Sequence, residues 1–187
     1  MKFEKLAIEG AWLARSAFHR DERGSFREWF KAEEIRDATS REFAVSQSNI
    51  SISQKGVLRG IHYSLALQGQ AKWVTCVTGT IWDVIVDIRP SSPTFKKWIG
   101  VELSGKSGDE IFISEGLGHG FISLEDNSCV AYLLTTPYSP TEEFEIDPLD
   151  PELAIAWPLP ERWMSSKDSA APTLAIRLAE GNLPHSM

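Results

Sequence analysis

Two segments of the chain gather polar and basic side chains that can carry out chemistry. The first, GVLRGIHYSLALQGQAKWV (56–74), places Arg59, His62, Gln70 and Lys72 among apolar residues typical of β-strands. A histidine free of metal can abstract a proton near neutral pH, and a nearby ammonium can stabilise a negative oxygen. A lone histidine in a strand is also compatible with a hydrogen-bonded core residue, but the neighbouring Arg and Lys favour a site.

The second segment is SEGLGHGF (114–121), in which three glycines surround His119. Glycines let the backbone approach a bound molecule closely, although a simple β-turn is a fair alternative. Tyr132, in CVAYLLT, can donate a proton from its phenol or serve as a core aromatic. Asp168, in SSKD, can orient a histidine through its Nδ1–H or cap a helix.

These residues do not supply the ligands of a metal-binding cupin, a β-barrel class that uses H-x-H followed by Glu and a later His. The first motif reads His62-Tyr63-Ser64, Lys72 lies near the position of the Glu, and His119 alone matches the later ligand. Because a catalytic metal needs about three protein ligands, we expect no metal and no other cofactor. The chain also lacks G-x-S-x-G, P-loop and G-x-G-x-x-G motifs, which disfavours hydrolase and nucleotide-binding interpretations.

Short strands broken by Gly, Pro, Asn and Ser must position these side chains. Their spacing of roughly 8–12 residues is typical of a β-sandwich or barrel. Helices are expected at 31–39 and 173–180, and the Pro-rich segment 147–160 is expected to wrap the surface. The expected strands are 25–30, 45–51, 57–63, 72–78, 80–88, 98–103, 110–113, 119–124 and 128–135.

Several of these strands carry polar residues where a barrel's inner face should lie. For any one strand, a solvent-exposed face explains the pattern equally well. Several such strands together predict a barrel with a polar cavity that holds a ligand. The residues concerned are Gln47, Asn49, His62, Gln70 and Lys72.

Length and charge narrow the possible functions. The 187 residues predict one domain over 1–187, with a C-terminal extension from about residue 161. The net charge of −7 argues against nucleic-acid and membrane partners, although a local basic pocket for a small anion remains possible. No signal-peptide core and no 18-residue apolar run occurs, so we expect a cytoplasmic protein.

Over nearly its whole length the chain resembles the RmlC-like family of dTDP-4-dehydrorhamnose 3,5-epimerases, which are metal-free cupins. The resemblance implies an all-β cupin jelly-roll barrel with a few short helices, acting as a homodimer on a dTDP-linked 4-keto-6-deoxy sugar. The matching pieces are ERGSFREWF (22–30), QSNIS (47–51), GVLRGIHY (56–63), QAKWVTCVTG (70–79), DVIVDIRPSSPTF (83–95), SEGLGHGF (114–121), AYLLTTPYSP (131–140) and DPELAIAWP (150–158).

The same resemblance implies a role for each residue that matches the family pattern. His62 is similar to the general base, Asp168 to its orienting partner, Tyr132 to the acid on the opposite face, and Lys72 to the cation beside the C4 oxygen. Other positions resemble contacts to the diphosphate (Arg23, Arg59, Lys167), to the thymidine (Phe26, Glu28, Tyr138, some of them brought by a partner subunit) and to the sugar (Gln47, Asn49, His119).

The chemistry implied is epimerisation at C3 and C5 through an enolate. A ketone at C4 acidifies both C–H bonds, so a base and an acid on opposite faces can invert each centre without a redox cofactor. The sequence departs from the commonest pattern at LALQGQAK, Gly118 and Ser114-Glu115. The SEGLGHGF form is similar to members from antibiotic deoxysugar pathways as well as rhamnose pathways, some of which invert one centre only. Two alternatives therefore stay open: an epimerase of C3 or C5 only, and a catalytically silent cupin that binds sugar nucleotides.

Overall fold

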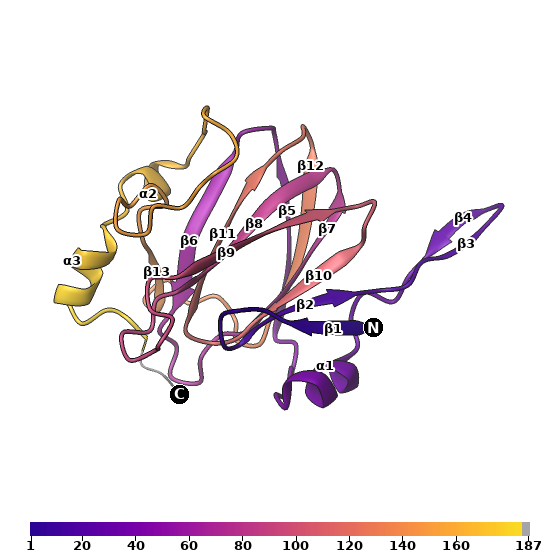
Figure 1. Ribbon diagram of the computed structural model, residues 1–187, viewed down its shortest axis with the longest axis horizontal. Coiled ribbons are helices and arrows are strands. Elements are labelled where there is room, and N and C mark those ends of the chain that lie inside the picture. The colour runs from indigo at the N-terminus through magenta and orange to yellow at the C-terminus, as the bar shows by residue number, and fades with distance from the viewer. Residues whose placement is uncertain (185–187) are drawn as a thin grey trace.

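Two antiparallel sheets pack against each other in the computed structural model, which describes residues 1–184 (Figure 1). A separate hairpin, β3 (His19–Asp21) and β4 (Gly24–Phe26), projects from them as an arm. The six-stranded sheet has the order β1 (Lys2–Lys5), β2 (Ala11–Arg15), β10 (Asp109–Ile113), β7 (Lys72–Thr78), β12 (Ser128–Leu134) and β5 (Gln47–Ser53). The five-stranded sheet has the order β13 (Glu143–Glu145), β6 (Leu58–Ser64), β11 (Leu117–Ser123), β8 (Thr80–Asp87) and β9 (Trp98–Ser104). The predicted all-β class is confirmed.

Strand alternation decides which side chains fill the space between the sheets. In β8, Ile81 and Ile85 face inward and pack with Val74 and Ile111 of the opposite sheet. The other face of β8 points outward and is covered by the C-terminal part of the chain. The buried residues of that outer layer include Val84, Val86, Ile146, Leu153, Trp157, Leu174 and Leu183.

Helices and loops cover the outer faces of the sheets. The helix predicted at 31–39 is present as α1 (Ala32–Thr39), which has Glu33 and Glu34 in its first turn and buries Ile35. Carboxylates near a helix N-terminus are favourable because they face its positive dipole end. The predicted C-terminal helix is α3 (Leu174–Ala179), and a short α2 (Ser166–Ser169) precedes it.

The structure differs from the sequence predictions mainly at the arm and the chain ends. The strand expected at 25–30 ends at Phe26, because the following residues are held by side-chain contacts instead of a strand ladder. The segment 147–160 follows the surface but also contributes buried Leu153 and Trp157. Strands β1, β2, β3 and β13 were not predicted. The expected domain of 1–187 includes residues 185–187, which lie outside the described residues.

A bulge in β6 turns two polar side chains toward the same cavity. Phe121 pairs with Arg59, and His119 pairs with His62, so three residue steps on β6 match two on β11. The extra residue reverses the normal alternation, and Arg59 and His62 both point inward. Gly60 makes this possible, since a Cβ there would lie 2.6 Å from the Cα of Gly120.

Candidate active site

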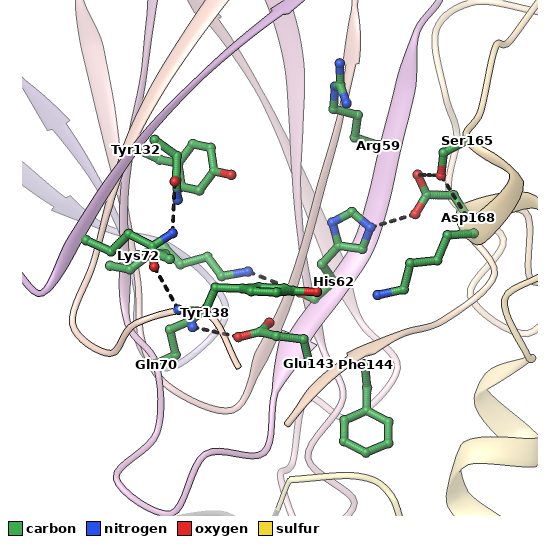
Figure 2. A pocket seen from close by; sticks show the side chains of 14 residues that line it. Arg59, His62, Gln70, Lys72, Tyr132, Tyr138, Glu143, Phe144, Ser165 and Asp168 are labelled. Atoms are coloured by element: carbon green, nitrogen blue, oxygen red, sulfur yellow. Dashed lines mark hydrogen bonds and ion pairs between the residues drawn. The ribbon is translucent and has the colours of Figure 1, made fainter. Parts of the chain in front are cut away.

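An open cavity of about 410 Å³ lies between the sheets and is lined by most of the predicted site residues (Figure 2). The predicted polar cavity is therefore present. Its lining includes Gln47, Asn49, Arg59, His62, Gln70, Lys72, Tyr132, Tyr138, Glu143, Lys167 and Asp168. A smaller cavity of about 170 Å³ adjoins it, sharing Arg59, His62, Lys72 and Tyr132 and adding Ser51 and His119.

His62 and Asp168 form a hydrogen-bonded pair on one wall. Nε2 of His62 lies 2.6 Å from Oδ1 of Asp168, so the carboxylate meets Nε2 and not the expected Nδ1–H. Ser165 caps α2 and its hydroxyl donates to Oδ2 of Asp168 at 2.9 Å. In Figure 2 the other ring nitrogen of His62 faces the cavity. This geometry holds the ring in one orientation and leaves a nitrogen free to accept a proton.

Asp168 is buried, with only 5% of its side chain exposed. Burial acts to raise the pKa of this carboxyl, but the hydrogen bonds and charges of His62, Ser165 and Lys167 outweigh it, so the pKa lies below its ordinary value. Asp168 is therefore ionised at neutral pH and stabilises positive charge on His62.

Lys72 reaches into the cavity from β7 of the other sheet. Its Nζ donates to the backbone carbonyl of His62 at 3.3 Å, and its side chain is buried. Burial lowers the pKa of Lys72, while the carboxylates of Glu143 and Asp83 act in the opposite direction. A buried ammonium whose donors are not all used can stabilise an oxyanion that develops in the same space.

Tyr132 faces His62 across the cavity (Figure 2). The tyrosine comes from β12 of the six-stranded sheet and the histidine from β6 of the five-stranded sheet. Burial raises the pKa of the Tyr132 phenol, although the charge of Arg59 opposes this. The phenol thus keeps its proton at neutral pH and can donate it from the side opposite to His62.

A second histidine–aspartate pair lies in the smaller cavity. Nε2 of His119 is 2.8 Å from Oδ2 of Asp83, whose side chain is fully buried. Within residues 1–184, Oδ1 of Asp83 has no hydrogen-bond partner. The pair lies next to Lys72 and gives this end of the site a polar wall.

The remaining cavity residues form a polar rim. Gln47 connects two of them, since its Nε2 donates to Oδ1 of Asn49 at 2.9 Å and its Oε1 accepts from the backbone N–H of Tyr138 at 2.8 Å. Arg59 is held by Ser53 Oγ at 3.1 Å, and Lys167 pairs with Glu145 at 2.9 Å. Both cations line a cavity in a protein of negative net charge, which suits a small anionic ligand.

Three predicted binding residues lie on the arm or at its base and do not line this cavity. Arg23 pairs with Asp21 in the hairpin, and Phe26 is 64% exposed. Glu28 forms an ion pair with Lys31 at 2.7 Å. The structure therefore does not bring these three residues together with the other predicted binding residues of the same chain.

Comparison with known proteins agrees with this geometry. The sequence model of the dTDP-4-dehydrorhamnose 3,5-epimerase family matches residues 5–175. The chain belongs to this family. The predicted family, the cupin jelly-roll fold and the isomerase class are thereby confirmed.

Three relatives of this epimerase family member show how far the likeness extends. The dTDP-4-dehydrorhamnose 3,5-epimerase of Mycolicibacterium smegmatis is 44% identical over 98% of this chain and 91% of its own length. The rmlC epimerase structure from Mycobacterium tuberculosis has a TM-score of 0.97 and 43% identity, covering 99% of this chain and 94% of that one. A 3'-monoepimerase from Streptomyces bikiniensis, solved in complex with dTDP-quinovose, has a TM-score of 0.93 and 43% identity, covering 96% and 91%.

The structure adds residues to this epimerase site that sequence reasoning missed. Glu143 accepts from Gln70 Nε2 at 2.8 Å and lines the cavity, but the short strand that carries it gave no pattern. Ser165 caps α2 and donates to Asp168 three residues later, and the S-x-x-D spacing of a helix N-terminus is the signal that could have found it. Asp83 did leave a signal, because it is a charged residue on the inward face between Ile81 and Ile85.

The described part of the chain has neither a cluster of metal-binding side chains nor a membrane-spanning helix. Residues 1–184 contain no group of three or more His, Cys, Asp and Glu side chains placed to hold a metal ion. The same residues include no helix that is long and apolar enough to cross a membrane.

Proposed function

We propose that this chain epimerises a dTDP-linked 4-keto-6-deoxyhexose at C3 and C5 through an enolate. The observation that carries the proposal is the pairing of His62 with ionised Asp168 on one wall of the cavity, opposite Tyr132 on the other. Inversion at carbon needs a base and an acid on opposite faces of the sugar ring, and the two sheets supply one each.

In the proposed mechanism, His62 removes a proton from the carbon beside the C4 ketone. The electron pair of the broken C–H bond moves to the C4 oxygen, where the ammonium of Lys72 stabilises the enolate. Tyr132 then donates its proton to the same carbon from the other side, and the centre inverts. A positioned acid or base contributes about 10²–10⁴-fold to such a rate, and a donor at the oxyanion about 10²–10³-fold.

Binding of the nucleotide is assigned to the cationic and aromatic rim of the cavity. Arg59 and Lys167 suit the diphosphate, and Tyr138 suits the thymine ring. Gln47, Asn49 and His119 suit the sugar hydroxyls. Each of these side chains lines one of the two adjoining cavities, which supports the assignment.

Product analysis in deuterated buffer tests the proposal. The protein is incubated with the dTDP-linked 4-keto-6-deoxyglucose, and proton NMR follows C3 and C5. We expect deuterium at both carbons and inversion at both. If the proton signals of C3 and C5 both persist, the result would contradict the epimerase activity and favour a silent binding protein.

A single-centre epimerase is the second candidate, because the chain is 43% identical both to the Streptomyces bikiniensis 3'-monoepimerase and to the rmlC epimerase. The same experiment separates the two activities. Inversion and deuterium at C3 alone would establish the single-centre reaction.

We also propose that the protein is a homodimer. The outer face of the six-stranded sheet leaves Ile50, Ile52 and Val77 exposed, and β5 is an edge strand of that sheet. An exposed apolar edge strand needs cover. A second copy can supply it, and the projecting arm can then bring Phe26 toward the partner's cavity.

Light scattering at micromolar concentration tests the dimer. We expect twice the mass of one chain, and Ile50→Lys should shift the protein toward monomer. Leu67→Lys is the matched control, because Leu67 is 98% exposed but lies in the loop between β6 and β7 and not on a strand of the sheet. A monomeric mass for the unsubstituted protein would contradict the proposal.

Two further expectations from the sequence belong to this proposal. We assign the protein to the cytoplasm, which is supported by the free thiols of Cys76 and Cys129. We also assign the whole chain to one cupin domain with a C-terminal extension. Cell fractionation and a single cooperative unfolding transition, respectively, are the observations that test these two points.

A further inference from the structure

The arm leaves the barrel as an exposed hairpin. Every residue of β3 and β4 is exposed. Among residues 1–184, the hairpin makes local side-chain contacts: Arg23 pairs with Asp21, and the ring of His19 lies 6.3 Å from that of Phe26. The guanidinium of Arg20 lies 4.8 Å from the ring centroid of Phe18, which immediately precedes the hairpin. These contacts shape the hairpin but cannot fix its direction relative to the barrel, so that direction must be set at its base.

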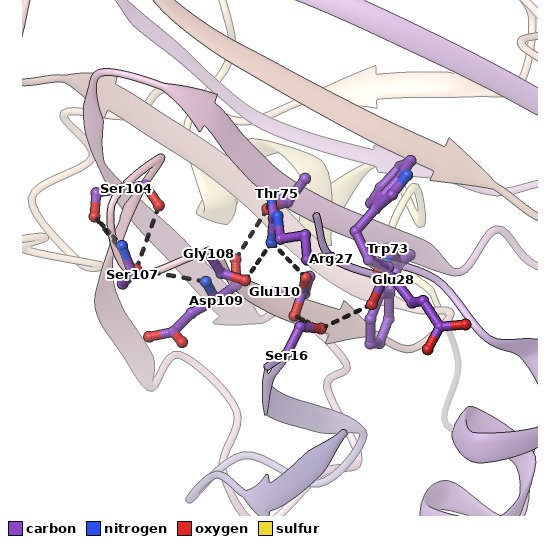
Figure 3. A network of polar contacts seen from close by, with 11 residues as sticks. Ser16, Arg27, Glu28, Trp73, Thr75, Ser104, Ser107, Gly108, Asp109 and Glu110 are labelled. Atoms are coloured by element: carbon purple, nitrogen blue, oxygen red, sulfur yellow. Dashed lines mark hydrogen bonds and ion pairs between the residues drawn. The ribbon is translucent and has the colours of Figure 1, made fainter. Parts of the chain in front are cut away.

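At the base of the arm, the buried carboxylate of Glu110 contacts the chain both before and after the hairpin (Figure 3). Oε1 of Glu110 accepts from Nη1 of Arg27 at 2.7 Å, and Arg27 directly follows the hairpin. Oε2 of Glu110 lies 3.0 Å from Oγ of Ser16, which precedes the hairpin. The Ser16 hydroxyl also lies 3.1 Å from the carbonyl oxygen of Glu28. We name Ser16, Arg27 and Glu110 the root clamp.

Arg27 is fixed by further acceptors on the outer face of the six-stranded sheet. Its Nη2 donates to Oγ1 of Thr75 at 3.1 Å, and its Nη1 also donates to the carbonyl of Gly108. Gly108 leaves room for this, since a Cβ there would lie 3.0 Å from Nη1 and 2.5 Å from the ring of Phe18. The planar guanidinium fork suits several acceptors at once, which a lysine could not reproduce.

Burying the charged groups of the root clamp costs more free energy than covering the sheet with apolar side chains would. Glu110 is fully buried and the Arg27 side chain is only 14% exposed. Burial raises the pKa of Glu110 to about 8, with Ser16 and Arg27 acting in the opposite direction. The clamp geometry suits either protonation state, because a protonated Oε2 can donate to Ser16 Oγ. Buried charge pairs add little net stability compared with apolar packing, so a role in fixing geometry is the better explanation.

We propose that Glu110, acting through Arg27 and Ser16, is a positioning residue that aims the arm and thereby places Phe26 and Glu28 against the nucleotide bound by a second copy. Arg27 lies between those two residues in the chain, so the contacts that hold its guanidinium restrict the backbone beside both. The inference rests on the proposed function, which assigns the nucleotide to the cavity and lets the arm bring Phe26 toward the cavity of a second copy.

A double-mutant cycle tests this role with dTDP as the ligand. Isothermal titration measures dTDP affinity for the unsubstituted dimer, for Arg27→Met, for Phe26→Ala and for the double variant. We expect Arg27→Met to weaken binding about tenfold, with kcat at saturating substrate within about threefold. In the Phe26→Ala background, Arg27→Met should weaken dTDP binding less than about twofold, because the effects of substitutions at residues that act through each other are not additive.

Two more variants separate positioning from folding. Ser16→Ala removes one hydroxyl, should fold normally, and should weaken dTDP about threefold. Arg41→Met is the matched control: it breaks a partly buried ion pair with Glu115 at 2.9 Å, outside the arm, and should leave dTDP affinity unchanged.

The results that overturn the inference are specific. Three results for Arg27→Met would each contradict positioning through the arm. They are a loss of dTDP affinity that is equal with and without Phe26, no loss of dTDP affinity, and a loss accompanied by dissociation to monomers. Failure of the unsubstituted protein to bind dTDP would instead overturn the proposed function, and this inference with it.

Discussion

Replacing Asp168 with Asn tests how strongly turnover depends on the charge behind His62. Asparagine has nearly the same shape, and its amide can still meet Nε2 of His62 and Oγ of Ser165. The variant loses only the negative charge that lies 2.6 Å from Nε2. When His62 takes a proton from carbon its ring becomes a cation, which the carboxylate stabilises and the amide does not.

The size of the effect follows from the contact and its burial. Hydrogen bonds to charged groups contribute about 1.5–3 kcal/mol. Asp168 is 5% exposed but His62 is 40% exposed, so solvent screens part of the interaction and we take about 2 kcal/mol. At about 1.4 kcal/mol for each factor of ten, kcat should fall about 30-fold.

The assay is NMR-monitored epimerisation at saturating substrate, together with dTDP titration. Asp168→Asn should keep dTDP affinity within about twofold, because the change acts on the reacting carbon. Ser165→Ala, which removes a support but keeps the charge, should cost about threefold in kcat. Asp147→Asn is the matched control, since Asp147 is outside the cavity lining and its carboxylate accepts from the backbone N–H of Leu149.

A kcat for Asp168→Asn within threefold of the unsubstituted enzyme would refute the reasoning. So would an equal fall for Asp147→Asn. The pH dependence gives a further check, because the pKa of Asp168 lies below its ordinary value. The stability contributed by the ionised form is present above the ordinary pKa and is lost as pH falls through the lowered one. The difference in unfolding free energy between the unsubstituted protein and Asp168→Asn should therefore become smaller as the pH falls.

The other predictions concern Tyr132, Lys72 and metal. Tyr132→Phe should retain exchange of substrate C–H for deuterium while net inversion falls, and a parallel fall in both would contradict a separate acid on the far face. Because burial lowers the pKa of Lys72, kcat should decline with rising pH before an ordinary lysine titrates; Lys72→Met should lower kcat about 10²–10³-fold and abolish this alkaline limb, whose persistence would assign it to another group. Prolonged treatment with EDTA or phenanthroline should leave the rate unchanged, and a loss restored by one divalent metal would contradict a metal-free base.

Regular alternation made much of the barrel predictable. β7 and β8 were located to within a residue, because Gly79 marks the boundary between them and one face of β8 is almost wholly apolar while the other carries Asp83 and Asp87. The polar inward face of β5 likewise revealed the cavity, since Gln47 and Asn49 repeat at a spacing of two. Local sequence is sufficient wherever one period governs the element.

Features set by tertiary contacts were not predictable. The segment after Phe26 has the composition of a strand, but Arg27 bonds to Glu110 and the Trp29 carbonyl accepts from Trp73, so no ladder forms. The three-residue strand β13, which carries Glu143, exists only because it pairs with β6. The nitrogen of His62 that faces its carboxylate also depends on how the C-terminal segment packs.

The central claim is that His62 is the base, and one variant tests it most directly. His62→Ala should show no deuterium incorporation at C3 or C5 of the keto sugar in deuterated buffer, because His62 is the group assigned to remove those protons. Its dTDP affinity should stay within tenfold, about 1.4 kcal/mol, since binding is assigned to other side chains. Exchange at a rate near that of the unsubstituted protein would contradict the account, as would a loss of dTDP affinity beyond tenfold.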